Sequence, residues 1–490
     1  MNLSRRSVLG ASAAAIVAAS LPHRAGASDL PQLNGSAIRS DLDLLRHAYE
    51  SVHPGLNRYL QPGAFGALID RAKIWAERDR TQQEIWLMLT RLTAAVRCGH
   101  TYPNPNNQTR AIKETLLSRR DRLPITFRWL GARMIVTGGR GGQSPLQPGT
   151  EILAVDGMTS RELLAKLMPL ARADGSNDSK RLDQLGIRSH GRYLAFDIFR
   201  SALMPEASGI VRLRTAPPAG PPRSIELGAL TEEELRTARQ EGRPDLGWTF
   251  EIDHNNLGRL TMPTWVTFNS QWDWQAYLDR IVDRLIDERA RGLILDLRGN
   301  EGGSDCGWHL LERLVQRDIA LPGFERRTRY RRLPDALRQA LDTWDDSFRD
   351  WGAAASGPDS SGFFRLQRED ADVDILRPRG RRFDKPIVVL VDASCSSATF
   401  QFANAVRQTG LATLIGETTG GNRRGINGGA FYFLRLPATG FEVDLPIIGF
   451  FSAGPQPDRG VEPHEYVATR QEDIAECLDR QMQRAAQRFS

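Results

Sequence analysis

The sequence predicts a multidomain α/β protein, and three observations support this fold class. In the C-terminal half, short apolar strand-like runs alternate with amphipathic helical segments, the pattern of a mostly parallel sheet covered by helices. The N-terminal part repeats apolar residues at helical spacing, and the middle part has short alternating strands. At 490 residues the chain exceeds the size at which one hydrophobic core keeps growing, which favours two or three domains.

Residues 1–27 have the three parts of an export signal: a charged start, an apolar run, and the small-residue site AGA at 25–27. Arg5 and Arg6, within the sequence SRRSVLG, resemble a twin-arginine signal, which exports folded proteins. A short membrane anchor is the alternative, but spanning a bilayer takes roughly 20 apolar residues. We expect cleavage before Ser28, a periplasmic or secreted protein, and no stable membrane span after the signal is removed.

The composition excludes several classes of protein. Hydrophobic residues make up 40% and charged residues 25% of the chain, so neither global disorder nor a membrane bundle is indicated. The net charge of +6 falls by three, to +3, when Arg5, Arg6 and Arg24 leave with the signal, and this is too weak to predict a nucleic-acid partner. The four cysteines have no metal-binding spacing, so we expect no metal and no other cofactor.

Residues 28–115 are predicted to form a helical N-terminal domain, because apolar residues recur every three or four positions from 37 to about 96. This pattern ends in the turn 97–103, RCGHTYP, where Gly and Pro interrupt it.

Residues 116–248 form a second predicted domain. There, the segment PGTEILAVDG at 148–157 followed by an amphipathic stretch resembles the strand, turn and helix of a peptide-binding PDZ module, and another small β-rich domain is the alternative.

Residues 249–490 are predicted to form the largest domain, with a buried sheet. An amphipathic helix at 274–286 precedes the apolar strand 293–297, and a second apolar strand at 386–391 precedes a helix at 397–408. The second strand and its helix are joined by VDASCSSA. A serine on such a turn exposes its hydroxyl beside free backbone N–H groups, which stabilise an oxyanion. The alternative is that Ser396 or Ser397 only caps the helix.

A glycine-rich turn, DLRGNEGG, follows the first apolar strand at residues 296–303. It is no phosphate loop, because no GK[ST] follows. The turn resembles the "DlRgNgGG" motif of the tail-specific, or C-terminal-processing, serine proteases. In that family the nucleophile turn lies nineteen residues before a "liGe.T.G" strand end, and Ser397 and Gly416 have this interval. The resemblance continues through GVEP at 460–463.

This resemblance implies a ClpP/crotonase-like catalytic core, with the PDZ-like region holding a peptide by strand addition. It implies Ser397 as the nucleophile of a serine peptidase acting on peptides or proteins. The oxyanion hole would use the N–H groups of Ala398 and Gly302, with Gly303 as the next choice. A non-catalytic peptide-binding protein on the same fold and a serine esterase are the alternatives. The sequence leaves the oligomeric state open.

The general base departs from the family pattern. Many members use a lysine about twenty-five residues after the serine, where this chain has Asn422, and no lysine follows the serine at all. Arginine cannot replace it, because its pKa is too high to accept a proton. Instead, His100 in the sequence GHT resembles the "dGHt" turn of the tricorn-like branch, and histidine has a suitable pKa near 6.5. Asp458 is the expected third group that orients His100, with Glu417 as the alternative.

Three cysteines lie beside these segments: Cys98 precedes His100, Cys395 precedes Ser397, and Cys306 follows Gly303. If the segments converge in the fold, the cysteines converge as well. A disulfide between two of them would need Cα atoms within about 7 Å. The alternative is three buried thiols, because free cysteine packs like a small apolar residue.

Overall fold

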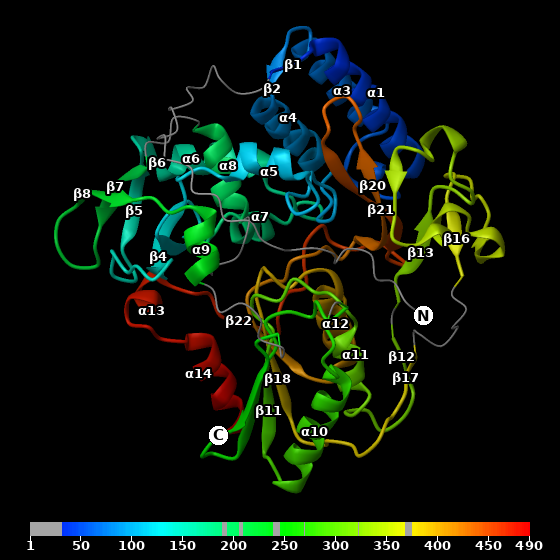
Figure 1. Ribbon diagram of the computed structural model, residues 1–490. Helices are drawn as coiled ribbons and strands as arrows, with labels where there is room; N and C mark the ends of the chain where they lie inside the picture. Colours follow the sequence, from blue (N-terminus) through cyan, green and yellow to red (C-terminus); the bar gives the residue numbers. More distant parts are fainter. Residues whose placement is uncertain are drawn as a thin grey trace, which may run out of the picture.

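A computed structural model describes residues 32–188, 194–204, 209–238, 246–268, 270–321, 323–367 and 375–490. The predicted export signal at 1–27 lies outside these residues. Helices of the N-terminal part lie above a middle sheet and a C-terminal sheet (Figure 1). Within the described part of the chain, no helix is both long and apolar enough to cross a bilayer. The predicted mixed α/β architecture is confirmed.

The N-terminal part is helical, as predicted. Its apolar residues at helical spacing, including Leu42, Leu45 and Tyr49, lie on one face of the first helix and are fully buried. A capping box between Thr81 and Glu84 fixes the start of the third long helix. The elements are β1 (Gln32–Leu33), α1 (Gly35–Val52), α2 (Leu56–Tyr59), α3 (Ala64–Trp75), β2 (Arg80–Thr81), α4 (Gln82–Ala95) and α5 (Arg110–Leu117).

The middle part contains an antiparallel sheet in the order β3-β4-β5-β7-β8. The predicted turn after 151–155 has positive φ at both Asp156 and Gly157, the conformation of a tight hairpin, and a helix follows it. The strand, turn and helix are therefore as predicted, whereas their identity as a PDZ module stays a prediction. The elements are β3 (Ile125–Leu130), β4 (Arg133–Gly139), β5 (Glu151–Val155), β6 (Met158–Thr159), α6 (Ser160–Leu167), α7 (Asp178–Gln184), α8 (Ala195–Leu203), β7 (Ile210–Ala216), β8 (Arg223–Gly228) and α9 (Glu232–Ala238).

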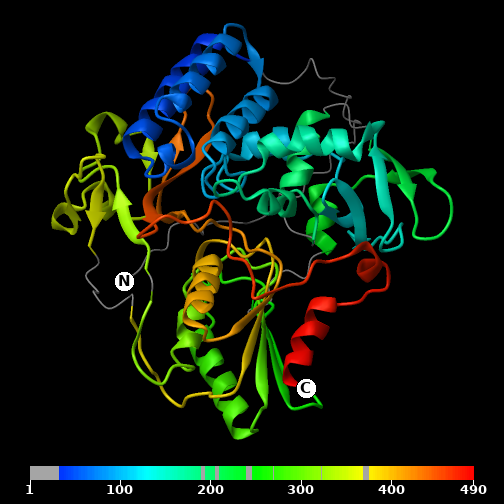
Figure 2. The ribbon, with the colours of Figure 1, turned by 180° about the vertical axis from the view of Figure 1, so that it is seen from behind.

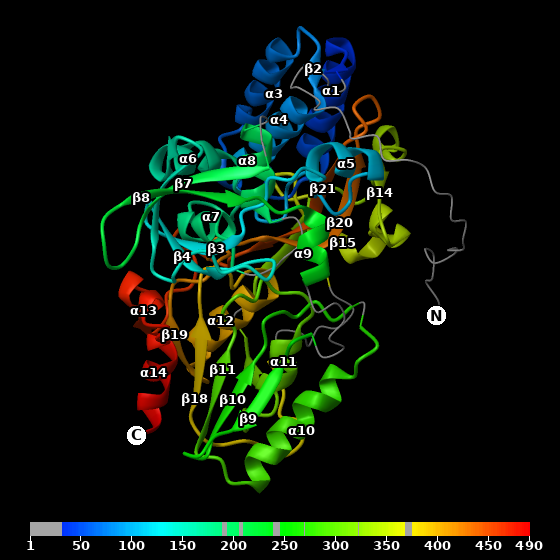
Figure 3. The ribbon, with the colours of Figure 1, turned by 60° about the vertical axis from the view of Figure 1, so that its left-hand side comes forward.

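The C-terminal part has a six-stranded sheet in the order β22-β19-β18-β11-β10-β9, parallel except for β9. Leu293 and Leu295 face one core with α10, α11 and α12, while Ile294 faces a second core with α14 on the other side (Figures 2 and 3). Burial on both faces explains the continuous apolar runs that predicted this sheet. The elements are β9 (Thr249–Ile252), β10 (Leu257–Thr261), α10 (Trp274–Asp287), β11 (Gly292–Asp296), α11 (Cys306–Leu311), β18 (Ile387–Val391), α12 (Ser397–Thr409), β19 (Thr413–Gly416), β22 (Glu465–Tyr466), α13 (Gln471–Ala475) and α14 (Arg480–Ala486).

A third sheet, in the order β14-β20-β21-β13-β16-β15, joins the C-terminal part to the N-terminal helices. The long hairpin β20–β21 lies beside the blue helices in Figures 1 and 2, and its residues share a hydrophobic core with them. The predicted domain limits of 28–115, 116–248 and 249–490 stay predictions. The hydrophobic core around this hairpin contains residues from all three ranges. The strands of this sheet are β13 (Glu325–Thr328), β14 (Leu341–Asp342), β15 (Ala355–Ser356), β16 (Phe364–Leu366), β20 (Asn427–Arg435) and β21 (Glu442–Phe451). Two short strands, β12 (Ile319–Ala320) and β17 (Ile375–Leu376), pair with each other in a separate sheet.

A buried carboxylate links the first helix to the tip of this hairpin. Asp41 in α1 is 3% exposed and accepts hydrogen bonds from the backbone N–H groups of Ala438, at 3.1 Å, and Thr439, at 2.6 Å. Leaving a buried donor without an acceptor costs about 1–3 kcal/mol per group. We therefore expect Asp41→Ala to lower the thermal unfolding midpoint. Asp43→Ala, in the same helix but at an exposed ion pair with Lys73, is the control and should leave the midpoint unchanged. Equal midpoints for the two variants would contradict this role of Asp41.

Candidate active site

Ser397 lies on the turn from strand β18 into helix α12, in a strained backbone conformation. Its φ is +51°, a left-handed value that a residue with a side chain adopts at a cost of about 1–2 kcal/mol. Ser396 is the N-cap, but no side-chain capping hydrogen bond is present, and its hydroxyl donates instead to the carbonyl of Glu301 at 3.3 Å. Helix capping therefore does not explain this pair of serines.

The glycine-rich turn packs directly against the serine. A Cβ at Gly302 would lie 2.9 Å from the Cβ of Ser397, the carbonyl oxygen of Ser396 and the backbone nitrogen of Ala398. Gly302 also has a φ of +99°. Both the space and the backbone conformation thus require glycine here. The predicted convergence of the glycine turn and the nucleophile turn is present in the structure.

One of the three predicted oxyanion donors already has an acceptor in the structure. The N–H of Gly302 donates to the side-chain oxygen of Asn300 at 2.8 Å, so this donor is already occupied. Within the described residues, the backbone N–H groups of Gly303 and Ala398 donate to no acceptor. Ala398 has a free N–H because it lies in the first turn of a helix, where the preceding residues offer no carbonyl in position. Of the predicted donors, Gly303 and Ala398 are therefore the ones whose N–H groups have no acceptor within the described residues.

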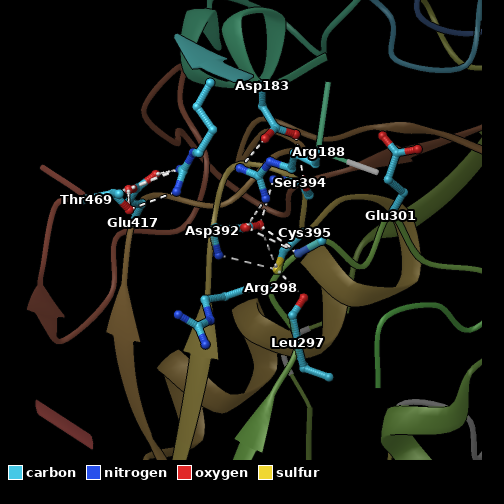
Figure 4. Close-up of polar contacts among 12 residues, drawn as sticks. Asp183, Arg188, Leu297, Arg298, Glu301, Asp392, Ser394, Cys395, Glu417 and Thr469 are labelled. Atoms are coloured by element: carbon cyan, nitrogen blue, oxygen red, sulfur yellow. Dashed lines mark hydrogen bonds and ion pairs between the residues drawn. The ribbon is translucent and has the colours of Figure 1, made fainter. Parts of the chain in front are cut away.

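Asp392, at the carboxyl end of β18, holds the two turns together (Figure 4). Its carboxylate accepts from the N–H of Gly299 at 3.2 Å and from the N–H of Ser394 at 2.9 Å. Arg188, from the middle part of the chain, donates to it at 2.5 Å and also pairs with Asp183. Burial would raise the pKa of Asp392, but the charge of Arg188 and these hydrogen bonds keep it below its ordinary value. Asp392 is thus an ionised anchor for both turns.

His100 lies in the turn after α4, against strand β20. Its ring is 5.8 Å from that of Phe431 between centroids, and its Nδ1 is buried without a hydrogen-bond partner in the described residues. Burial lowers the pKa of His100, while the negative charges of Asp174 and Glu301 oppose the shift. Because Glu301 acts on the imidazole and also accepts from Ser396, the histidine and the serine turn share one neighbourhood.

Asp174 is the carboxylate that acts most strongly on His100, and the sequence contained no motif that indicated it. It is 3% exposed and accepts from the N–H of Gly99, next to the histidine, at 3.0 Å. Arg172 donates to the carbonyl of Gly99 at 2.7 Å, so the same segment holds the histidine turn on two sides. Only the fold brings these residues together, since about 75 positions separate them in the chain.

Lys180 and Glu301 form a second pair beside the site that sequence reasoning missed. Lys180 is 7% exposed, and its Nζ donates to Glu301 at 2.5 Å and to the carbonyl of Ser394 at 3.3 Å. The charge of Lys180 lowers the pKa of Glu301 to about 2. Burial opposes the charged form of Lys180, but Glu301 and Asp183 raise its pKa, so this amine is protonated and unsuited to act as a base.

Asp458, the predicted carboxylate partner of His100, makes its hydrogen bonds to other residues, and its role in orienting the histidine stays a prediction. Its carboxylate accepts from Ser176 and, at 2.7 Å, from Asn422, the residue at the family's lysine position. Asn422 is fully buried and serves as a hydrogen-bond donor between neighbouring segments. The alternative, Glu417, accepts from Arg128 and Thr469. Both carboxylates satisfy structural hydrogen bonds elsewhere.

The cysteines near the site are free thiols, so the hypothesis of a disulfide is wrong and the alternative of buried thiols is confirmed. Cys98 accepts from Asn427 at 3.3 Å, and burial raises its pKa to about 11. Cys395 donates to the carbonyl of Leu297 at 3.1 Å. Cys306 is fully buried in the core beside β11 and β18. High pKa values make these thiols poor nucleophiles.

Comparisons with known proteins agree with this geometry. Residues 256–464 match the model described as peptidase family S41. Among solved structures, mature CPAF aligns over 90% of this chain and 94% of its own, at 16% identity and a TM-score of 0.60. Mature CPAF complexed with lactacystin aligns over 93% and 98%, at 16% identity and a TM-score of 0.61. At this identity the two structures show a shared fold. No curated protein sequence matches the chain.

Asn300 should be essential for the shape of the glycine turn, although it has no reactive role. It is fully buried, accepts from Gly302 and from Thr399, and donates to the carbonyl of Met262 at 2.7 Å. We expect Asn300→Ala to reduce kcat/KM for peptide hydrolysis by about 100-fold, the effect of displacing a reacting group by about 1 Å. Asn404→Ala, a buried asparagine within helix α12, is the matched control. Equal activities of the two variants would contradict this role.

Proposed function

We propose that the chain is a serine peptidase of family S41, whose model matches residues 256–464, and that it hydrolyses peptide bonds through an acyl-enzyme on Ser397. The observation that carries the proposal is the positive φ of Ser397, at a turn in contact with Gly302. A strained serine is retained where its position matters for chemistry. A protein that only bound peptides would have no need of this strain.

His100 is the proposed general base. Its Nε2 takes the proton from the Ser397 hydroxyl, and the oxygen attacks the carbonyl carbon of the substrate. The N–H groups of Gly303 and Ala398 then hold the negative oxygen of the tetrahedral intermediate. The imidazolium returns its proton to the leaving amine, and water hydrolyses the acyl-enzyme by the same steps in reverse order.

Asp174 is the proposed carboxylate that supports His100, in place of Asp458. Its buried negative charge stabilises the imidazolium that forms when the histidine takes the proton. Its hydrogen bond from Gly99 fixes the turn that carries the histidine. Asp458 then has a structural role, because it joins Asn422 and Ser176.

We further propose that the protein acts after export to the periplasm or outside the cell. The twin-arginine-like start, apolar run and AGA site of residues 1–27 support this location. A serine esterase with the same nucleophile is the remaining alternative. Comparing an ester and an amide with the same acyl group distinguishes the two: a peptidase cleaves the amide at a measurable rate, whereas an esterase cleaves only the ester.

The serine assignment is tested with two single variants. We expect Ser397→Ala to reduce kcat/KM for peptide hydrolysis by more than about 1,000-fold, since removal of the nucleophile leaves only the weaker contributions of the site. The thermal midpoint should not fall. Ser396→Ala is the matched control and should retain most of the activity. If the two results are exchanged, the nucleophile is Ser396.

The base assignment is tested by the dependence of kcat/KM on pH. Because burial lowers the pKa of His100, activity should rise with pH through a midpoint below 6.5, where the imidazole loses its proton. Asp174 raises the pKa of His100, so Asp174→Asn should shift this midpoint to a still lower pH and reduce the maximal rate. Asp458→Asn is the control and should leave the midpoint in place. A midpoint above about pH 8 would indicate a lysine-like base instead.

A further inference from the structure

A buried carboxylate on strand β21 has no part in the proposed chemistry, yet it binds a loop of the site. Asp444 is 6% exposed. Its Oδ1 accepts a hydrogen bond from the side-chain amide of Asn107 at 2.9 Å, and its Oδ2 accepts one from the amide of Asn104 at 2.9 Å. A buried carboxylate is usually paired with a cation, whereas both of these donors are neutral. The presence of Asp444 at this place therefore needs a reason.

The loop that Asp444 binds follows directly after the proposed base. The backbone N–H of Asp444 donates to the carbonyl of Tyr102 at 3.0 Å, and Tyr102 is two residues after His100. Asn104 and Asn107 belong to the same loop. This loop lies between helices α4 and α5 and is not part of a helix, so contacts of this kind hold it in place. One residue of β21 thus contacts the loop at residues 102, 104 and 107.

The same hairpin supports the ring of His100. The ring lies against Phe431, and a Cβ at Gly428 would lie 3.6 Å from the Cε1 atom of the imidazole. Both residues belong to strand β20, which pairs with β21 so that Phe433 lies opposite Asp444. Asp444 therefore joins the loop to the same hairpin on which the imidazole rests. A displacement of the loop would move the ring relative to this support.

Asp444 can hold the loop without a charge. Burial raises the pKa of Asp444 to about 7, and Glu442 acts in the same direction, whereas the two amides and Arg172 oppose the shift. The other titratable groups that interact with it are Tyr49 and Tyr102. The amide of Asn104 keeps its orientation, because its oxygen accepts a backbone N–H of the loop at 3.0 Å.

The amide of Asn107 is free to reverse, because its side-chain oxygen accepts no hydrogen bond within the described residues. A neutral group with one donor and one acceptor at the position of Asp444 can then donate to Asn107 and accept from Asn104. Asparagine is such a group and has the same shape as aspartate. It should therefore replace Asp444, whereas alanine should not.

We propose that Asp444 is a positioning residue for peptide hydrolysis: it holds the loop at 102–107 and thereby keeps His100 in place as the general base. This inference rests on the proposed role of His100. A displacement of a reacting group by about 1 Å lowers the rate by about 100-fold. The effect should fall on kcat rather than on KM, because Asp444 acts on the position of the base and does not hold the peptide.

The test compares steady-state kinetics on one peptide, at a temperature below the unfolding midpoints of all variants. Asp444→Ala should lower kcat by about 10- to 100-fold and leave KM within about twofold, and Asp444→Asn should retain most of kcat. Asp41→Ala is the matched control, because Asp41 is also a buried carboxylate that binds the hairpin, and it should keep the wild-type kcat. A wild-type kcat in Asp444→Ala, or an equal loss in Asp444→Asn, would overturn the positioning role.

A second pair of changes removes the same hydrogen bonds from the side of the loop. The double variant Asn104→Ala with Asn107→Ala leaves β21 intact, so it serves as well if Asp444→Ala does not fold. It should lower kcat by a similar factor with KM unchanged. An unchanged kcat in this variant would overturn the inference.

A double-mutant cycle with His100 shows whether Asp444 acts through the base. Added to His100→Ala, the change Asp444→Ala should cause no further loss of the residual activity, because a positioning residue has no effect once the group it positions is gone. A further loss of about 10-fold or more would overturn the positioning role and leave the base assignment intact. Full activity in His100→Ala alone would instead overturn the proposed base.

Discussion

The carboxylate of Asp392 is the interaction on which the geometry of the site depends. It receives N–H groups from the glycine turn after β11 and from the serine turn after β18, and it pairs with Arg188 from the middle part of the chain. A single buried charge thus fixes three segments that are remote in sequence. Removing one partner of such a group leaves the other buried and unpaired, which costs about 3–5 kcal/mol. The relative placement of the two turns follows from this anchor.

Close backbone contact is the second constraint, and it links the strain at Ser397 to the glycines. Gly302 approaches the serine turn so closely that any side chain would collide with it. The strain is offset by the parallel sheet beneath, whose strands β11 and β18 pair over four residues and end together at the site. His100 reaches this place from the N-terminal part because the hairpin β20–β21 shares a core with the N-terminal helices. The proposed site therefore takes its residues from the N-terminal, middle and C-terminal parts of the chain.

The strands and helices that have a local sequence pattern could be predicted from the sequence. The buried strands at 292–296 and 387–391 and the helix from Ser397 agree with the predictions within one or two residues, because burial on both faces leaves continuous apolar runs. Strands β20 and β21 were not predicted, since glycines and a proline interrupt their pattern. Asp174 and Lys180 could not be predicted, because only tertiary packing brings them to His100. The hydrogen bond from the N–H of Gly302 to Asn300 could not be predicted either, because no motif shows it.

The most direct test of the central claim is to find which residue reacts with a serine-directed fluorophosphonate. The folded protein is labelled and digested, and the tryptic peptide spanning residues 383–407, which holds Ser394, Ser396 and Ser397, is fragmented in the mass spectrometer. The strained turn and its free N–H groups predict a single adduct on Ser397, lost when the protein is unfolded before labelling. An adduct on Ser394 or Ser396, or labelling that survives unfolding, would contradict the account.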